Sequence, residues 1–143
     1  MILIIAIILG AAVFLLGGTL STSHGPQPPA PSPAIAALAA AIATAEGSNP
    51  EWNNPGDLTK SFGFSTAGVA NSAGVLKFQT SADGWNALYA QLSLIVSGGS
   101  HWKLGTSLSD FGLGYSGGDP NWAKNVANSL GVSEDSSLGD LLT

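Results

Sequence analysis

The sequence predicts an α+β domain that is mainly helical, contains a small β-hairpin, and follows an N-terminal transmembrane helix. Three observations support this fold class. Apolar residues recur at helical spacing in separate segments between residues 33 and 131. Phe and Val positions alternate within residues 60–80, where Gly and Asn mark turns. Residues 2–20 are apolar and carry no charge.

Length and composition limit the possible functions. The chain has 143 residues, a net charge of -5, no cysteine and no arginine. This length suits one domain with an appendage. Nucleic-acid binding needs a basic surface, so we expect no nucleic-acid partner. Thiolate metal sites are excluded, and His24 and His101 are too far apart in sequence for a recognisable metal motif, so we expect no metal and no cofactor.

The N-terminal segment is predicted to reach a membrane. As a helix, residues 2–20 would span about 28 Å, enough to cross a bilayer core. A cleaved signal peptide requires a positive n-region and a shorter apolar stretch, so an uncleaved anchor over residues 1–20 is favoured, although the small residues 21–23 suit a peptidase. The positive-inside rule assigns no orientation because no Lys or Arg precedes Lys60.

A proline-rich linker follows the predicted anchor. Residues 21–33 contain five prolines, which favour polyproline II, a semi-rigid spacer. A featureless disordered connector would have the same composition. The soluble domain is predicted over residues 34–143.

The first helix of the domain is predicted to carry an acid on its apolar face. Ser32 and Pro33 form an N-cap and a first-turn proline, and the helix runs to Glu46 before a glycine. Glu46 continues the stripe of Ile35, Leu38 and Ile42. Burial and the negative helix end would both raise the pKa of Glu46, as general acid catalysis requires. The alternative is a partly exposed glutamate at a frayed helix end.

The remaining elements follow from caps and spacing. Residues 60–80 predict two or three short strands, in which Phe62 and Phe64 alternate. Ser81 is predicted to cap a second helix that stops at Gly98, with Trp85 and Tyr89 in the core or, alternatively, lining a sugar cleft. A short helix is expected at residues 108–113, a third full helix from an Asp119 N-cap to Gly131, and a single turn at residues 138–142.

Three segments resemble, in the same order, those of the lysozyme-like lytic transglycosylases, in particular the phage virion-associated and bacterial secretion-linked group. They are AEGSNPEWNNPGDL, KFQTSADGWNAL and SLSDFGLGYSGGDPNWAKNVANSLGV, and they lie between residues 45 and 132. The chain departs from the family at Asp57, where asparagine is usual. It also lacks an arginine after the loop, where Lys60 is the nearest basic residue.

The resemblance implies a lysozyme-like fold in which Glu46 acts alone. Such an acid protonates the glycosidic oxygen and then deprotonates the 6-hydroxyl of the substrate, which gives a 1,6-anhydro product. No other carboxylate has a spacing that demands partnership with Glu46. The resemblance and the residue chemistry predict that substrate is bound by Trp52, Asn53, Asn54 and Tyr115. The asparagines could instead stabilise a turn, and the tryptophan could cover the loop.

The function expected from this resemblance is local opening of the cell wall. We expect a single-pass protein of a virion membrane or bacterial cell envelope, with its catalytic domain outside the cytoplasm. Its expected partners are peptidoglycan glycan strands, a membrane and other virion or envelope proteins. One alternative is a non-catalytic structural protein with a glycan- or partner-binding domain, and another is hydrolysis of a different N-acetylglucosamine glycan. Because peptidoglycan is anionic, the acidic chain would bind it only through local contacts.

Overall fold

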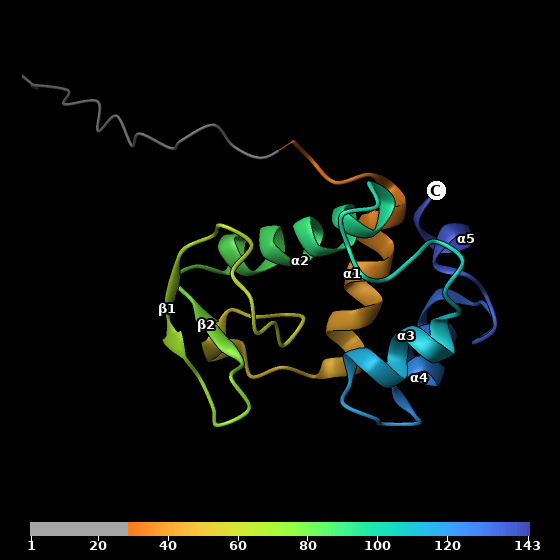
Figure 1. Ribbon diagram of the computed structural model, residues 1–143. Helices are drawn as coiled ribbons and strands as arrows, with labels where there is room; N and C mark the ends of the chain where they lie inside the picture. Colours follow the sequence, from red (N-terminus) through yellow and green to blue (C-terminus); the bar gives the residue numbers. More distant parts are fainter. Residues whose placement is uncertain (1–28) are drawn as a thin grey trace, which may run out of the picture.

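The computed structural model describes residues 29–143, which form a mainly helical α+β domain with one small sheet (Figure 1). The predicted anchor over residues 1–20 and most of the linker 21–33 lie outside the described residues. Within residues 29–143, none of the helices has the length and hydropathy needed to cross a bilayer. The elements in chain order are α1 (Pro33–Glu46), the 3-10 helix η1 (Pro50–Trp52), β1 (Thr66–Val69), β2 (Leu76–Phe78), α2 (Ser81–Val96), α3 (Leu108–Tyr115), α4 (Trp122–Leu130) and α5 (Leu138–Leu142).

Helix α1 occupies the centre of the domain. It packs against α2, α4 and α5. Figure 1 shows the hairpin on one side of α1 and helices α3, α4 and α5 on the other. Ile35, Leu38 and Ile42 are buried, as their spacing predicted, and the many alanines of α1 permit close approach of its neighbours. The last turn of α1 therefore reaches the junction between the two sides.

The strands form a two-stranded antiparallel sheet with an irregularity after Thr66. Thr66 pairs with Phe78 and Val69 pairs with Leu76. The predicted strand at Phe62 and Phe64 is wrong. Phe62 has a φ of 50°, in the left-handed region, and the Phe64 N–H donates to the carbonyl of Ser61 in a turn, so this segment cannot continue a strand.

Neutral hydroxyl groups cap most of the helices. The side chains of Ser32, Thr80, Ser107 and Ser137 each accept a backbone N–H in the first turn of α1, α2, α3 and α5. The α1 cap agrees with the prediction, and so does the left-handed Gly47 after its end. The N-cap of α2 is Thr80 rather than the predicted Ser81, a difference of one residue.

Helix α4 begins later than predicted. Its N-cap is Asn121, which makes no side-chain capping hydrogen bond, and Asp119 lies outside the helix. The reason is a local turn, in which Oδ1 of Asp119 accepts the backbone N–H of Asn121 at 2.9 Å. Gly131 ends α4 as expected. Helix α3 runs on to Tyr115, beyond the predicted residue 113, which brings that tyrosine onto a helix.

Candidate active site

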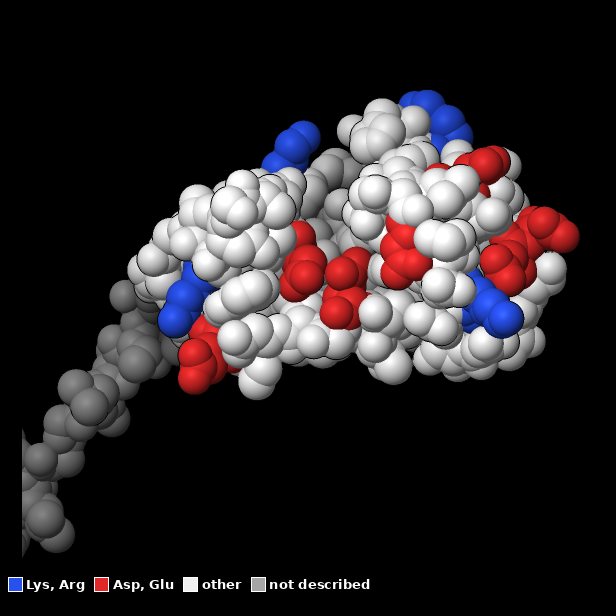
Figure 2. All heavy atoms as spheres, turned by 90° about the horizontal axis from the view of Figure 1, so that it is seen from below, with Lys and Arg blue, Asp and Glu red and all other residues white. Residues whose placement is uncertain are grey.

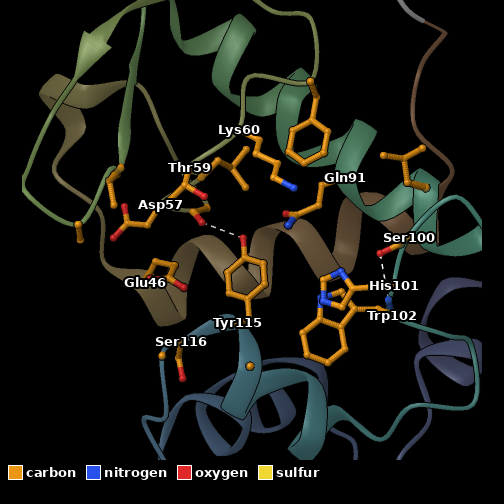
Figure 3. A pocket seen from close by; sticks show the side chains of 18 of the residues that line it. Glu46, Asp57, Thr59, Lys60, Gln91, Ser100, His101, Trp102, Tyr115 and Ser116 are labelled. Carbon is orange, nitrogen blue, oxygen red and sulfur yellow. Dashed lines mark hydrogen bonds between the residues drawn. The ribbon is translucent and has the colours of Figure 1, made fainter.

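A cavity of about 680 Å³ lies where the two sides of the domain meet. One wall comes from the loop after η1 and from the hairpin connection, and the other from α2, the loop after α2 and the end of α3. Figure 3 shows this arrangement, with Glu46 at one end of the cavity. The polar and aromatic residues of the lining are Glu46, Asp57, Thr59, Lys60, Phe62, Gln91, Ser100, His101, Trp102, Tyr115 and Ser116.

Glu46 is held by a tryptophan from α4. Its side chain is half-buried, and its Oε1 accepts the indole N–H of Trp122 at 2.7 Å. The Trp122 ring is itself fixed by packing, with ring centroids 5.0 Å from Tyr115 and 5.8 Å from Phe111. Trp122 is only 3% exposed. The carboxyl group therefore has one fixed oxygen at the helix end.

The surroundings of Glu46 raise its pKa. The largest cause is burial, which disfavours the charged form, and the negative charges of Asp57 and Asp119 act in the same direction. The hydrogen bond from Trp122 opposes them by stabilising the carboxylate. The net effect keeps the proton on Glu46 to a higher pH than is usual for a glutamic acid. This is the property that the sequence predicted for a general acid.

Tyr115 connects α3 to the loop opposite. Its hydroxyl donates a hydrogen bond to the carbonyl oxygen of Gly56 at 2.8 Å (Figure 3). Burial and the negative charges of Glu46 and Asp57 raise the pKa of Tyr115, so the phenol stays neutral and remains a donor. Tyr115, which was predicted to bind substrate, lines the same cavity as Glu46, and its hydroxyl bonds to the loop backbone.

Asn53 and Asn54 hold the loop to the hairpin. The amide nitrogen of Asn54 donates to the carbonyls of Leu58 and Leu76, and its oxygen accepts the N–H of Leu58. Asn53 has a φ of 53° and donates to the carbonyl of Phe78 at 3.2 Å. The sequence left open whether these asparagines bind substrate or stabilise a turn, and these hydrogen bonds show that they stabilise the loop.

The asparagines and the tryptophans of this region lie away from the Glu46 cavity. Asn53 and Asn54 line a smaller cavity of about 300 Å³, together with Trp85 of α2. Trp85 and Tyr89 are half-buried and pack against the core. Trp52, at the end of η1, is half-buried and lines neither cavity. Its sugar-stacking role stays a prediction.

Charge differs between the two ends of the main cavity. The acidic residues Glu46 and Asp57 lie on one side of Tyr115 (Figure 3). The basic residue Lys60 lies on the other side, together with Gln91 and His101. Figure 2 shows acidic side chains across the middle of the face seen from below, with lysines further out. Within residues 29–143, no group of three or more His, Asp and Glu side chains is arranged to hold a metal ion.

Comparison with known proteins adds no relative. No protein-family model, curated protein or solved structure matched the chain. The resemblance to lysozyme-like transglycosylases therefore stays a prediction that rests on the residues themselves.

Sequence reasoning missed two residues of the site. Trp122 lies within the predicted third full helix but was assigned no role, because its contact with Glu46 spans 76 residues of sequence. Asp57 was noted as a departure from the family, with no role assigned. Its position 11 residues after Glu46 does not by itself indicate proximity, and the turn at Asn54–Asp57 brings it to the cavity wall.

Proposed function

We propose that the chain is a peptidoglycan lytic transglycosylase that cleaves the β-1,4 bond between N-acetylmuramic acid and N-acetylglucosamine, with Glu46 as its catalytic acid. One observation carries the proposal. Glu46 presents a half-buried carboxyl of raised pKa at the wall of a cavity of about 680 Å³. This volume is within the range of about 300–1,000 Å³ that is usual for ligand sites.

The proposed reaction uses one carboxyl group twice. Glu46 donates its proton to the glycosidic oxygen as the bond to the anomeric carbon breaks. The resulting carboxylate then accepts the proton of the 6-hydroxyl of the muramoyl residue, whose oxygen bonds to the anomeric carbon. The products are a free 4-hydroxyl and a 1,6-anhydro end, and Glu46 is protonated again. The Trp122 hydrogen bond supports this cycle because it orients the carboxyl in both protonation states.

The other side chains of the cavity suit a glycan strand. Tyr115 and Trp102 contribute aromatic surface, and Lys60 supplies a positive charge for the carboxylates of an anionic substrate. This local charge matters because the net charge of -5 gives no long-range attraction. We further propose that residues 1–20 anchor the domain to a virion membrane or a bacterial envelope, where it opens the wall for phage genome delivery or for assembly of an envelope machine.

The test compares the wild-type chain with a Glu46→Gln variant on purified peptidoglycan. Glutamine can still accept the Trp122 hydrogen bond through its amide oxygen, so the fold is retained while the proton donor is lost. We expect the rate of soluble fragment release to fall by about 10²–10⁴-fold or more. Mass spectrometry of the fragments identifies the reaction, because only transglycosylation leaves 1,6-anhydro ends.

Other outcomes would contradict the proposal in different ways. Fragments with reducing ends would indicate hydrolysis. Glycan binding without cleavage by either protein would favour the alternative of a non-catalytic structural protein.

A further inference from the structure

Asp57 differs from three other aspartates of the domain in its hydrogen bonding, and it has a buried carboxylate oxygen. Asp83, Asp119 and Asp140 each accept a local hydrogen bond at or near the start of a helix, which explains their presence structurally. The Asp57 side chain accepts none from the residues that the structure describes, and its Oδ1 is buried without a partner. A buried carboxylate oxygen without a partner is costly, so it calls for a role other than stability.

The backbone of Asp57 fixes its side chain at the cavity wall. Its φ is 47°, in the left-handed region that few residues other than Gly, Asn and Asp tolerate. The Asp57 N–H donates to the carbonyl of Asn54, and the neighbouring Gly56 carbonyl accepts the Tyr115 hydroxyl. Asparagine tolerates this backbone conformation equally well, so the positive φ does not explain why the residue is aspartate. What aspartate adds at this position is a negative charge.

Glu46 and Asp57 are the two acidic residues among the described ones that line the cavity. They lie on the same side of Tyr115 (Figure 3). Most glycosidases have two carboxyl groups beside the scissile bond, one as the acid and the other as a nucleophile or as a base for water. A carboxylate in the second position can also stabilise the positive charge of the transition state.

We propose that Asp57 is a second catalytic carboxylate, which stabilises the positive charge that develops at the anomeric carbon. The inference rests on the proposed function. When Glu46 protonates the glycosidic oxygen, the bonding electron pair leaves with that oxygen, and the anomeric carbon and ring oxygen become positive. A carboxylate fixed at the cavity wall favours this state over the neutral ground state, so it accelerates bond breaking without tightening substrate binding.

The same charge acts on the acid. The groups that face Glu46 are Asp57 from the loop before β1, Tyr115 from α3, Asp119 from the turn before α4, and Trp122 from α4. Lys60 and His101 line the cavity beyond Tyr115. Of these groups, the two aspartates favour protonated Glu46. Loss of the Asp57 charge is therefore expected to lower the pKa of Glu46.

The experiment replaces Asp57 by asparagine in the full chain. Asn keeps the shape and tolerates the left-handed backbone, so Asp57→Asn changes the charge alone. We expect kcat to fall by about 10²-fold with KM changed little, and the alkaline limb of the pH profile to move to lower pH. The control Asp110→Asn removes one charge from the exposed start of α3 and is expected to leave both measurements unchanged.

A second readout does not depend on turnover. The NMR chemical shift of the Trp122 indole N–H reports the ionisation of Glu46 because the two groups are hydrogen-bonded. The signal is assigned by its absence in Trp122→Phe. In Asp57→Asn its titration midpoint is expected at lower pH than in the wild type. If Asp57→Asn fails to fold, Asp57→Gly also removes the carboxylate and tolerates the positive φ.

The outcomes separate the two proposals. An active wild type with an equally active Asp57→Asn variant overturns the role of Asp57 and leaves the proposed function standing. A wild type that does not cleave peptidoglycan overturns the proposed function and this inference with it.

Discussion

The indole N–H of Trp122 donates a 2.7 Å hydrogen bond to Oε1 of Glu46, which joins the end of α1 to the start of α4. This bond holds the carboxyl at the edge of the cavity. It also favours the carboxylate, against the effect of burial and of two neighbouring aspartates. Trp122 therefore both orients the acid and limits how far its pKa rises.

The first prediction concerns the Trp122→Phe variant. Phenylalanine keeps an aromatic ring against Tyr115 and Phe111 but cannot donate to Glu46. Because the lost hydrogen bond had lowered the pKa of Glu46, that pKa is expected to rise further, and the alkaline limb of the activity profile to move to higher pH. Trp85→Phe, which alters a tryptophan away from the main cavity, serves as the control and is expected to leave the limb in place. An unmoved limb in Trp122→Phe would contradict this account.

The second prediction links Glu46 to stability. Its folded pKa is raised above the usual value of 4.5, so the folded state holds a proton that the unfolded state has released. The contribution of this group to stability is present below the unfolded pKa and is lost as pH rises through the folded pKa. The wild type is therefore expected to lose stability relative to Glu46→Gln as the pH rises from the usual value of 4.5 through the raised pKa of the folded state. Urea unfolding of both proteins across this range measures the difference, and a constant difference would refute the raised pKa.

The third prediction concerns Asn54, which is 2% exposed. Asn54→Ala removes a side chain that makes hydrogen bonds to Leu58 and Leu76 and leaves buried backbone groups without partners. We expect a loss of about 2–4 kcal/mol in the free energy of unfolding. Asn128→Ala, at an exposed position on α4, is the matched control, with an expected change within about 0.5 kcal/mol. Equal effects in the two variants would show that the Asn54 network contributes nothing.

The fourth prediction concerns the contact between α2 and the loop. A Cβ added at Gly84 would collide with the backbone carbonyl of Asn53, which cannot move as a flexible side chain would. Gly84→Ala is expected to destabilise the fold by about 1–3 kcal/mol or more. Gly105→Ala adds the same methyl group where no atom lies within 4 Å, and is expected to be neutral. Thermal unfolding of both variants tests the packing, and a Gly84→Ala protein as stable as the wild type would disprove it.

Local signals explain the parts of the fold that were predicted correctly. The limits of α1 follow from Ser32, Pro33 and Gly47, which act within one helical turn of each end. The half-buried position of Glu46 follows from its place in the stripe of Ile35, Leu38 and Ile42. These features depend on neighbouring residues alone, so the sequence was sufficient to find them.

Features that depend on tertiary contacts were missed. Phe62 packs against the core with a left-handed backbone, and its alternation with Phe64 wrongly suggested a strand. The Trp122 contact with Glu46 joins α4 to α1. Trp122 and Ala123 also pack closely on α3, which Gly112 permits because a Cβ there would meet Ala123 at 2.8 Å and the Trp122 ring at 3.0 Å. The spacing of residues along the sequence does not predict which helices pack against each other.

The hydroxyl caps of α1, α2, α3 and α5 affect how the stability of the fold depends on ionic strength. A hydrogen bond from a backbone N–H to a neutral serine or threonine is barely weakened by dissolved ions, whereas attraction between exposed charges is screened within about 10 Å in 0.1 M salt. With only 9% charged residues, the chain has few surface charges for ions to screen. The fold is therefore expected to keep its stability in dilute and saline media alike.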